Sequence, residues 1–201
     1  MRYYKNKHKY YCGIDLHTKT MYVVIVDSQG LPVFEQNMNS THQDLLAAIQ
    51  PYRDNIVVGV ECIFSWYWMA DWCHENDVDF ILGHALYMKM IHGSKVKNDK
   101  IDAQKIAQMI FAGLFPLAYS YPDKELRAIR DLLRRRMKLM HDRAELMTHI
   151  KILGHQINNS FGSLRLNYKY NRKDLEKTFE NSSYRLNCET DLQLIDEYDR
   201  I

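Results

Sequence analysis

One continuous apolar run, NIVVGVE at residues 55–61, constrains the fold of this chain more than any other stretch. Its β-branched residues predict a strand, and the lack of apolar–polar alternation predicts that both faces of that strand are covered. The run VDFILG at residues 78–83 has the same character, and the aromatic-rich stretch at residues 65–77 predicts a helix between the two. This strand–helix–strand order predicts a parallel pair and therefore an α/β domain.

Three further strands are predicted before this parallel pair. Residues 11–16 and 21–27 are rich in apolar and aromatic side chains, and DSQG has the chemistry of a hairpin turn into a third strand, LPVFEQN. A helix follows at residues 40–52, with Ser40 or Thr41 as its N-cap. The predicted fold class is α/β, with a mixed sheet in which three antiparallel strands continue into parallel strands with helices.

The second half of the chain is predicted to be mainly helical. NDKIDAQKIAQMIFAGLF, from residue 98, has a strong helix start, and a long basic helical segment then runs over residues 122–154. Its apolar stripe consists of Leu126, Ile129, Leu133, Met137, Met140, Ala144, Met147 and Ile150. This alternating spacing of three and four residues is coiled-coil-like and fits a helical hairpin or a two-chain coiled coil. We expect a homo-oligomer that assembles through this segment.

The chain is predicted to have three parts. They are an α/β domain at residues 1–118, the long basic helical segment at residues 119–157, and a linker or incomplete C-terminal region at residues 158–201. The last part is richer in Asn, Ser and Tyr. It predicts two short amphipathic helices, near residues 172–180 and 189–199, without a clear core of their own.

Length, charge and cysteine spacing narrow the class of protein. The chain has 201 residues and a formal net charge of +2, which is too small by itself to diagnose a nucleic-acid partner. No stretch approaches the roughly 20 apolar residues of a membrane helix, and no long apolar run follows the basic N-terminus as in a signal peptide. The four cysteines are widely spaced and form no metal-binding pattern. We therefore expect a cytoplasmic protein without a membrane partner.

Four carboxylates occupy positions that favour function, namely Asp15, Glu61, Asp99 and Asp102. Asp15 belongs to the first predicted strand, where burial of a charge costs free energy unless the charge is paired. Glu61 ends a buried strand, at the edge of an α/β sheet where ligand sites gather. Asp99 and Asp102 share one face of the first turn of a helix. Because clustered carboxylates repel one another, a hard divalent cation such as Mg²⁺ would stabilise them, and two such ions can support phosphodiester transfer.

Each acid also has a structural alternative. Asp15 can be an acid at a strand end that is hydrogen-bonded to Thr18 or Thr20. Asp99 can be the N-cap of its helix, with the acid three residues later favoured by the helix dipole. Glu61 can pair with a lysine or an arginine. No single acid is specific, and the ordered set of four carries the argument.

Three sequence blocks, GIDLHTKT, VGVE and KNDKIDAQKIAQ, carry a resemblance to a known family. Over residues 10–155 the chain resembles the DEDD transposases of bacterial insertion sequences, and the D-x-x-D-A block at a helix start is the most specific match. The resemblance implies an RNase H-like fold, Mg²⁺ or Mn²⁺ as the cofactor with two ions bound, and DNA as the partner. The catalytic and metal-binding residues that it implies are Asp15, Glu61, Asp99 and Asp102. Asn98 stands where the family usually has threonine, and should cap the helix equally well.

One departure from the family concerns its second, C-terminal domain, which carries a serine thought to act as the nucleophile. No serine of this chain, including Ser182 and Ser183, matches that motif, and the chain ends at Ile201. We therefore expect a truncated transposase that is incomplete without this domain. Two alternatives stay open: a non-catalytic nucleic-acid-binding remnant, and a stand-alone endonuclease similar to Holliday-junction resolvases.

Basic residues near the third acidic block and on the long helix are candidate nucleic-acid contacts. These candidates are Lys95, Lys97, Lys100, Arg134, Arg135 and Arg136. The arginines can bind the phosphates of DNA or of a guide RNA, and family members use a similar helical segment for RNA contact. The alternative is a solvated helix face with ion pairs to Asp131, Asp142 and Glu145.

One histidine and a group of aromatic residues allow two interpretations each. His17 follows Asp15 by two residues and so points to the same face of a strand, where it can touch a metal or a phosphate. The sequence favours an ordinary polar neighbour. Trp66, Trp68 and Trp72 can stack on bases, but their helical spacing beside a buried strand favours a core position.

Overall fold

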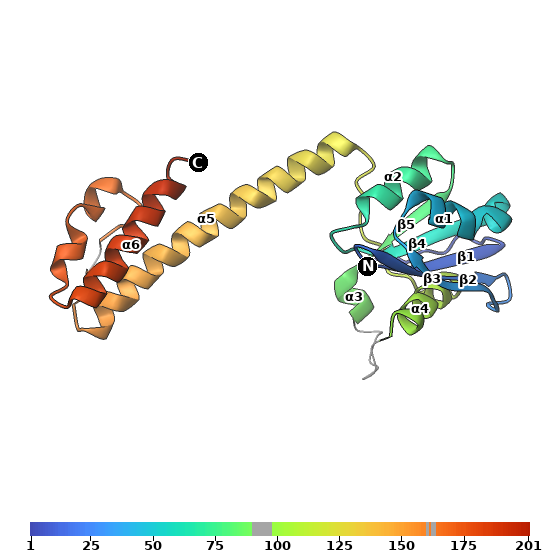
Figure 1. Cartoon of the computed structure of the whole chain (residues 1–201), viewed down its shortest axis with the longest axis horizontal. Coiled ribbons are helices and arrows are strands. Elements are labelled where there is room, and N and C mark those ends of the chain that lie inside the picture. The colour runs from blue at the N-terminus through green and yellow to red at the C-terminus, as the bar shows by residue number, and fades with distance from the viewer. Residues whose placement is uncertain (90–97, 160, 162–163) are drawn as a thin grey trace. The chain divides into compact units, whose positions relative to one another are not determined.

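Five strands form one mixed sheet in the first part of the chain (Figure 1). The strands are β1 (Tyr10–Leu16), β2 (Thr20–Asp27), β3 (Pro32–Asn39), β4 (Ile56–Glu61) and β5 (Asp79–Gly83). Their order is β3-β2-β1-β4-β5, with β1, β2 and β3 antiparallel and β1, β4 and β5 parallel. This RNase H-like α/β arrangement confirms the prediction of three antiparallel strands that continue into parallel ones.

The computed structural model describes residues 1–89, 98–159, 161 and 164–201. By its internal contacts the chain divides into two units, Met1–Pro122 and Asp123–Ile201. Lys95 and Lys97, two of the predicted nucleic-acid contacts, lie outside the described residues. Within the described ranges, no helix combines the length and the apolar character that a membrane crossing requires.

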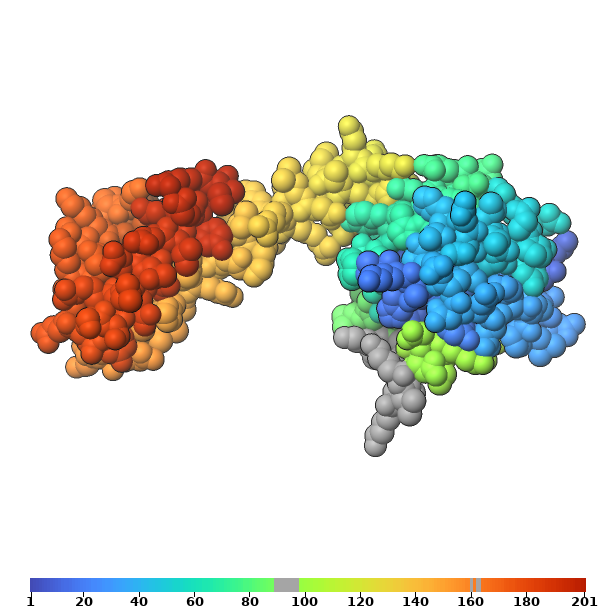
Figure 2. All heavy atoms as spheres, viewed as in Figure 1, coloured from blue at the N-terminus to red at the C-terminus, as the bar shows by residue number. Residues whose placement is uncertain are grey.

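Helices cover both faces of the sheet (Figure 1). α1 (His42–Ile49) and α2 (Tyr67–Glu75) lie over one face, and α3 (Ala85–Lys89) and α4 (Asp99–Phe111) lie over the other. A 3₁₀-helix at Gln50–Asn55 leads from α1 into β4. Because both faces are covered, the central strand β4 is apolar along almost its whole length. The edge strand β3 is largely exposed (Figure 2).

Alternate residues of the central strands divide between two cores. Cys12 of β1 and Val58 of β4 are buried beneath α1 and α2. Tyr11 and Val57, one residue earlier in each strand, are buried on the α4 face instead. Trp66 is also buried in the first of these cores, which confirms that the aromatic residues beside β4 serve as core.

α4 lies directly against β1, because β1 has a glycine at the point of contact. A Cβ atom at Gly13 would overlap the backbone of Ala103 and Ala107, so only glycine permits this close approach. Near the end of the helix, the ring of Phe111 contacts that of Tyr11 with centroids 5.6 Å apart. Since Tyr11 precedes Gly13, α4 runs antiparallel to β1, and its N-terminus lies toward the carboxyl end of that strand.

The second unit is built on the long helix α5 (Lys124–Gln156), which begins after its N-cap Asp123. The helix α6 (Ser182–Tyr198) packs against α5, and two short 3₁₀-helices, Lys169–Arg172 and Leu175–Thr178, precede α6 in the sequence. The core of this unit consists of Ile150, Leu153, Leu166, Leu175, Phe179, Cys188 and Ile195. The helix predicted near residues 189–199 lies within the longer helix α6, and the one predicted near residues 172–180 is the 3₁₀-helix Leu175–Thr178. The prediction that this region has no clear core is wrong, because α6 buries its apolar side against α5.

Candidate active site

Asp15 and Glu61 lie at the carboxyl ends of neighbouring parallel strands, on the face of the sheet that α4 covers. β1 and β4 pair in register up to Ile14 and Val60, and the two acids are the next residues of their strands. Ile14 and Val60 are buried beneath α1 and α2, so the alternation of side chains directs both acids to the opposite face. The side chain of Asp15 is 22% exposed and Glu61 is partly buried.

The first turn of α4 brings two more carboxylates to this region. Asn98 caps the helix, because its side-chain oxygen accepts a hydrogen bond from the backbone N–H of Lys100 at 3.0 Å. Asp99 is therefore not the cap, and its carboxylate is available for other contacts. Asp102 is partly buried and lies 3.9 Å from Lys105. A helix N-terminus favours nearby negative charge, either of these carboxylates or of a phosphate.

His17 lies between acids that come from two different elements. Its Nε2 is 3.4 Å from Oδ2 of Asp15 and 3.6 Å from Oδ1 of Asp99. The ligand atoms of these three residues lie within 4.8 Å of one another, which is close enough for one metal ion. Among the described residues, Glu61 and Asp102 are not members of this tight group.

Electrostatic interaction nevertheless links all four predicted acids. Burial raises the pKa of Asp15 above its usual value, and the neighbouring His17 partly lowers it. The charges of Asp99, Asp102 and Glu61 each raise the pKa of Asp15 further. An acid crowded in this way is stabilised by a cation, and oxygen ligands of this kind are those that hard divalent ions prefer. The donor set therefore fits a divalent metal.

Lys100, a predicted nucleic-acid contact, is engaged within the protein. It forms an ion pair with Glu35 of β3, and the hydroxyl of Tyr22 donates a hydrogen bond to Glu35 Oε1 at 2.9 Å. Tyr22 lies opposite Asp15 in the β1–β2 ladder. These contacts tie the first turn of α4 to the sheet next to Asp15, so Lys100 helps to position the acids of that turn.

The three predicted arginine contacts lie on α5 and are exposed. Within the described part of the chain, none of Arg134, Arg135 and Arg136 has an ion-pair partner. Asp142, one partner in the solvated-face alternative, instead pairs with Lys138. The guanidinium groups are thus available for phosphate oxygens, which they match in geometry.

The structure also decides between some of the sequence alternatives. Among the described residues, Asp15 contacts His17 and neither of the threonines, Thr18 and Thr20. From the sequence, His17 is expected to be only a polar neighbour of Asp15. The spacing of two residues between them is the only sequence feature that indicates a shared site. The contact of His17 with Asp99 depends on the packing of α4 and has no local signal in the sequence.

Comparison with known proteins identifies the family. A family model for DEDD transposases of the IS110 type, described as "Transposase", matches residues 12–157. A search of curated proteins gives no match. The matched region covers more than half of the chain and contains all four acids of the site. The chain therefore belongs to the DEDD transposase family.

Proposed function

We propose that this chain cleaves and exchanges DNA strands during the transposition of an insertion sequence, with Asp15, Glu61, Asp99 and Asp102 as its catalytic acids. The observation that carries the proposal is the crowding of negative charge at Asp15, to which the other three acids contribute. His17 and the N-terminus of α4 offset part of this repulsion, and a bound cation would offset more of it. Membership of the transposase family suggests the class of reaction, and the four acids suggest where in the chain the reaction takes place.

The proposed cofactor is a pair of divalent ions, Mg²⁺ or Mn²⁺. When bound, such ions polarise a phosphodiester and stabilise its attacking and leaving oxygens. Asp15 is suited to a central position among the ligands, since β1 is paired with β2 on one side and with β4 on the other. The ladder holds its backbone firmly, which keeps the carboxylate oriented.

The test is strand cleavage of duplex and four-way-junction DNA in Mg²⁺ or Mn²⁺. We expect Asp15→Asn to lower the cleavage rate about a hundredfold or more, since it removes charge at the reaction centre. Asp54→Asn is the matched control, because Asp54 is exposed on the 3₁₀-helix after α1 and outside the site. Equal rates for Asp15→Asn and the unsubstituted chain would contradict the proposal.

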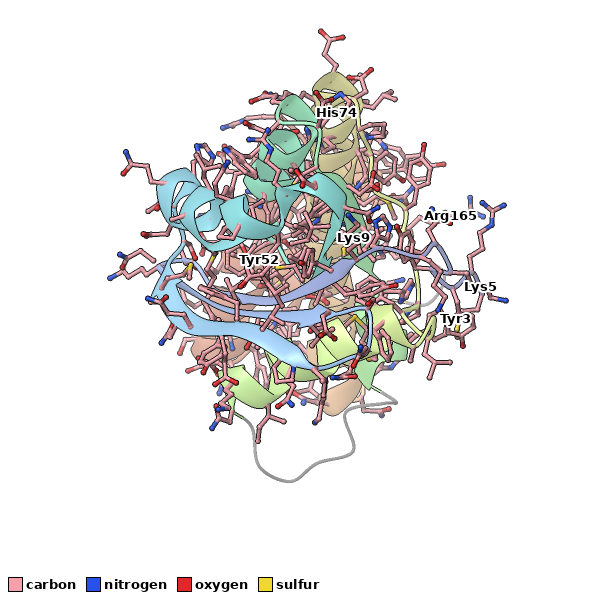
Figure 3. The ribbon with its side chains drawn as sticks, turned by 90° about the vertical axis from the view of Figure 1, so that its right-hand side faces the viewer. Tyr3, Lys5, Lys9, Tyr52, His74 and Arg165 are labelled. Carbon is pink, nitrogen blue, oxygen red and sulfur yellow. The ribbon has the colours of Figure 1, made fainter. Side chains whose placement is uncertain are left out.

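A second function, nucleic-acid binding without chemistry, is favoured by the exposed arginines of α5. Replacing Arg134, Arg135 and Arg136 by alanine should weaken binding and reduce the magnitude of its salt slope by about 3. Separate DNA and RNA probes distinguish a DNA site from a guide-RNA site. The control removes equal charge elsewhere, at exposed Lys5, Lys7 and Lys9. Lys5 and Lys9 are labelled in Figure 3. An equal effect of both triple variants would rule out a specific surface on α5.

We also propose that the chain forms a homo-oligomer through α5. The apolar stripe of α5 is more than half exposed at Leu126, Ile129, Leu133, Met137 and Met140. Exposed apolar side chains at this spacing form the seam of a coiled coil when a second helix covers them. The partner helix would belong to a second copy of this chain.

A further inference from the structure

His17 adds a nitrogen donor to a cluster of carboxylates. We propose that His17 is itself a metal ligand, together with Asp15 and Asp99, and that it makes the site select transition-metal ions such as Mn²⁺ over Mg²⁺. The inference rests on the proposed metal-dependent function, and it assigns a further ligand and the class of ion.

The distances at His17 fit metal coordination. Adjacent ligands of an octahedral ion with bonds of 2.0–2.1 Å lie about 3 Å apart. His17 Nε2 lies 3.4 Å from the Asp15 carboxylate and 3.6 Å from the Asp99 carboxylate. A shortening of roughly half an ångström would bring His17 Nε2 to the spacing of an adjacent ligand from each carboxylate. All three ligand atoms lie within 4.8 Å of one another. A single nitrogen faces both acids, so one ion can contact all three residues.

The backbone of His17 is held on both sides. Its N–H donates a hydrogen bond to the carbonyl oxygen of Thr20 at 2.9 Å. Its carbonyl oxygen accepts a hydrogen bond from the hydroxyl of Ser40 at 2.8 Å. The imidazole is therefore attached to a fixed turn directly after β1, while its side chain is 51% exposed and open to an ion from solution. A donor fixed in this way loses little freedom on binding.

The chemistry of the imidazole sets the preference for the ion. Mg²⁺ favours oxygen ligands and retains water. Imidazole nitrogen is a ligand of first-row transition ions, and their affinity for such a site rises along the series that begins with Mn²⁺. In the alternative role, His17 only forms ion pairs with Asp15 and Asp99. A bound cation would then displace His17 from the two carboxylates instead of binding to it. Only a neutral imidazole can donate its Nε2 electron pair to a metal.

The experiment is pulsed electron paramagnetic resonance of Mn²⁺ bound to the full chain, with calorimetric titration of Mn²⁺ and Mg²⁺. We expect a ¹⁴N coupling to Mn²⁺ that changes to a ¹⁵N coupling when the histidines are ¹⁵N-labelled. His17→Ala should abolish the coupling and weaken Mn²⁺ binding about tenfold or more, with a smaller loss for Mg²⁺. The control is His74→Ala, because His74 is exposed near the end of α2 (Figure 3).

The outcomes separate this inference from the proposed function. If Mn²⁺ binds, is lost in Asp15→Asn, and shows no nitrogen coupling in the labelled chain, the inference is overturned while the metal site stands. If neither ion binds, or if Asp15→Asn binds as the unsubstituted chain does, both fail. If His17→Ala does not fold, the ¹⁵N-labelling result on the unsubstituted chain still shows whether a histidine binds Mn²⁺. His17→Gln then replaces His17→Ala in the calorimetric titrations.

Discussion

At Asp15, burial and three neighbouring carboxylates oppose the charge that the proposed chemistry needs. An acid whose pKa is raised by folding lowers the stability of the fold progressively as the pH rises from the unfolded pKa to the folded one. This penalty is absent below the unfolded value of about 3.9 and is complete above the raised folded value. We expect Asp15→Asn to raise the free energy of unfolding at pH 7 in chelated buffer by roughly 0.5–2 kcal/mol, measured by urea unfolding. At pH 3 the gain should disappear.

Divalent ions should make the unsubstituted chain more stable than Asp15→Asn, which is the reverse of the order expected in chelated buffer. An ion at 100 times its dissociation constant stabilises the unsubstituted chain by about 2.7 kcal/mol and Asp15→Asn by much less. Asp54→Asn should behave as the unsubstituted chain in both buffers. Destabilisation by Asp15→Asn in chelated buffer would mean that the carboxylate has a structural partner and that charge crowding is not its main interaction.

Single residues show which parts of the site a sequence can predict. Asp15 and Glu61 follow from their places at strand ends, and Asp99 follows from its place at a helix start. Their common neighbourhood does not follow locally, because it depends on α4 crossing β1 at Gly13. His17 shows the same limit, since its second acid comes from α4. Local pattern fixes the element on which a residue lies, and long-range packing fixes its partners.

Among the larger elements, too, some can be predicted from the sequence and others cannot. The strands of the sheet were predictable because each has a run of β-branched or apolar residues between turn signals. The C-terminal core was not, because Phe179, Cys188 and Ile195 are sparse among polar residues. They become a core only against Ile150 and Leu153 of α5, which a local pattern does not reveal.

The contact of α4 with β1 can be tested at its glycine. Gly13→Ala places a methyl group against the backbone of Ala103 and Ala107, which must move. We expect a loss of about 1–3 kcal/mol in the free energy of unfolding, as in other overpacked cores, together with weaker metal binding, because Asp99 moves with the helix.

The control for this variant is Gly113→Ala. Gly113 has φ of +72°, and its added methyl group meets only Tyr4 O, at 3.6 Å. Backbone strain should cost it a similar 1–2 kcal/mol without any change in metal affinity. If Gly13→Ala loses stability but binds metal normally, the position of α4 is not what assembles the site.

The two units of the molecule can be followed separately, because all three tryptophans lie in the first unit. In the second unit, burial would raise the pKa of Asp199, but hydrogen bonds from Arg172 and Arg143 outweigh it and hold the pKa low. An acid with a lowered pKa contributes stability above its unfolded pKa and loses it as the pH falls through the folded one. We expect Asp199→Asn to cost about 1–3 kcal/mol at pH 7 and little at pH 2.

The readout is helical circular dichroism, which reports the helices of both units, and tryptophan fluorescence, which reports the first unit. The loss should appear in the former and leave the latter unchanged, with Asp54→Asn as control. Equal shifts of both signals would show that the two units unfold together, and an undiminished loss at pH 2 would remove the charge from the explanation.

The proposed assembly of the whole molecule would depend on the apolar stripe of α5. Leu133 and Met137 are 56% and 57% exposed and lie one turn apart on this stripe. Replacing both by glutamate keeps good helix formers but places charge in the proposed seam. Sedimentation equilibrium should show a concentration-dependent oligomer for the unsubstituted chain and a monomer for the double variant. Ala128→Glu is the control, since Ala128 is exposed and lies on the other side of the helix, two residues after Leu126. A monomeric unsubstituted chain would contradict the proposed assembly. An oligomer that survives both glutamates would place assembly on a surface other than this stripe of α5.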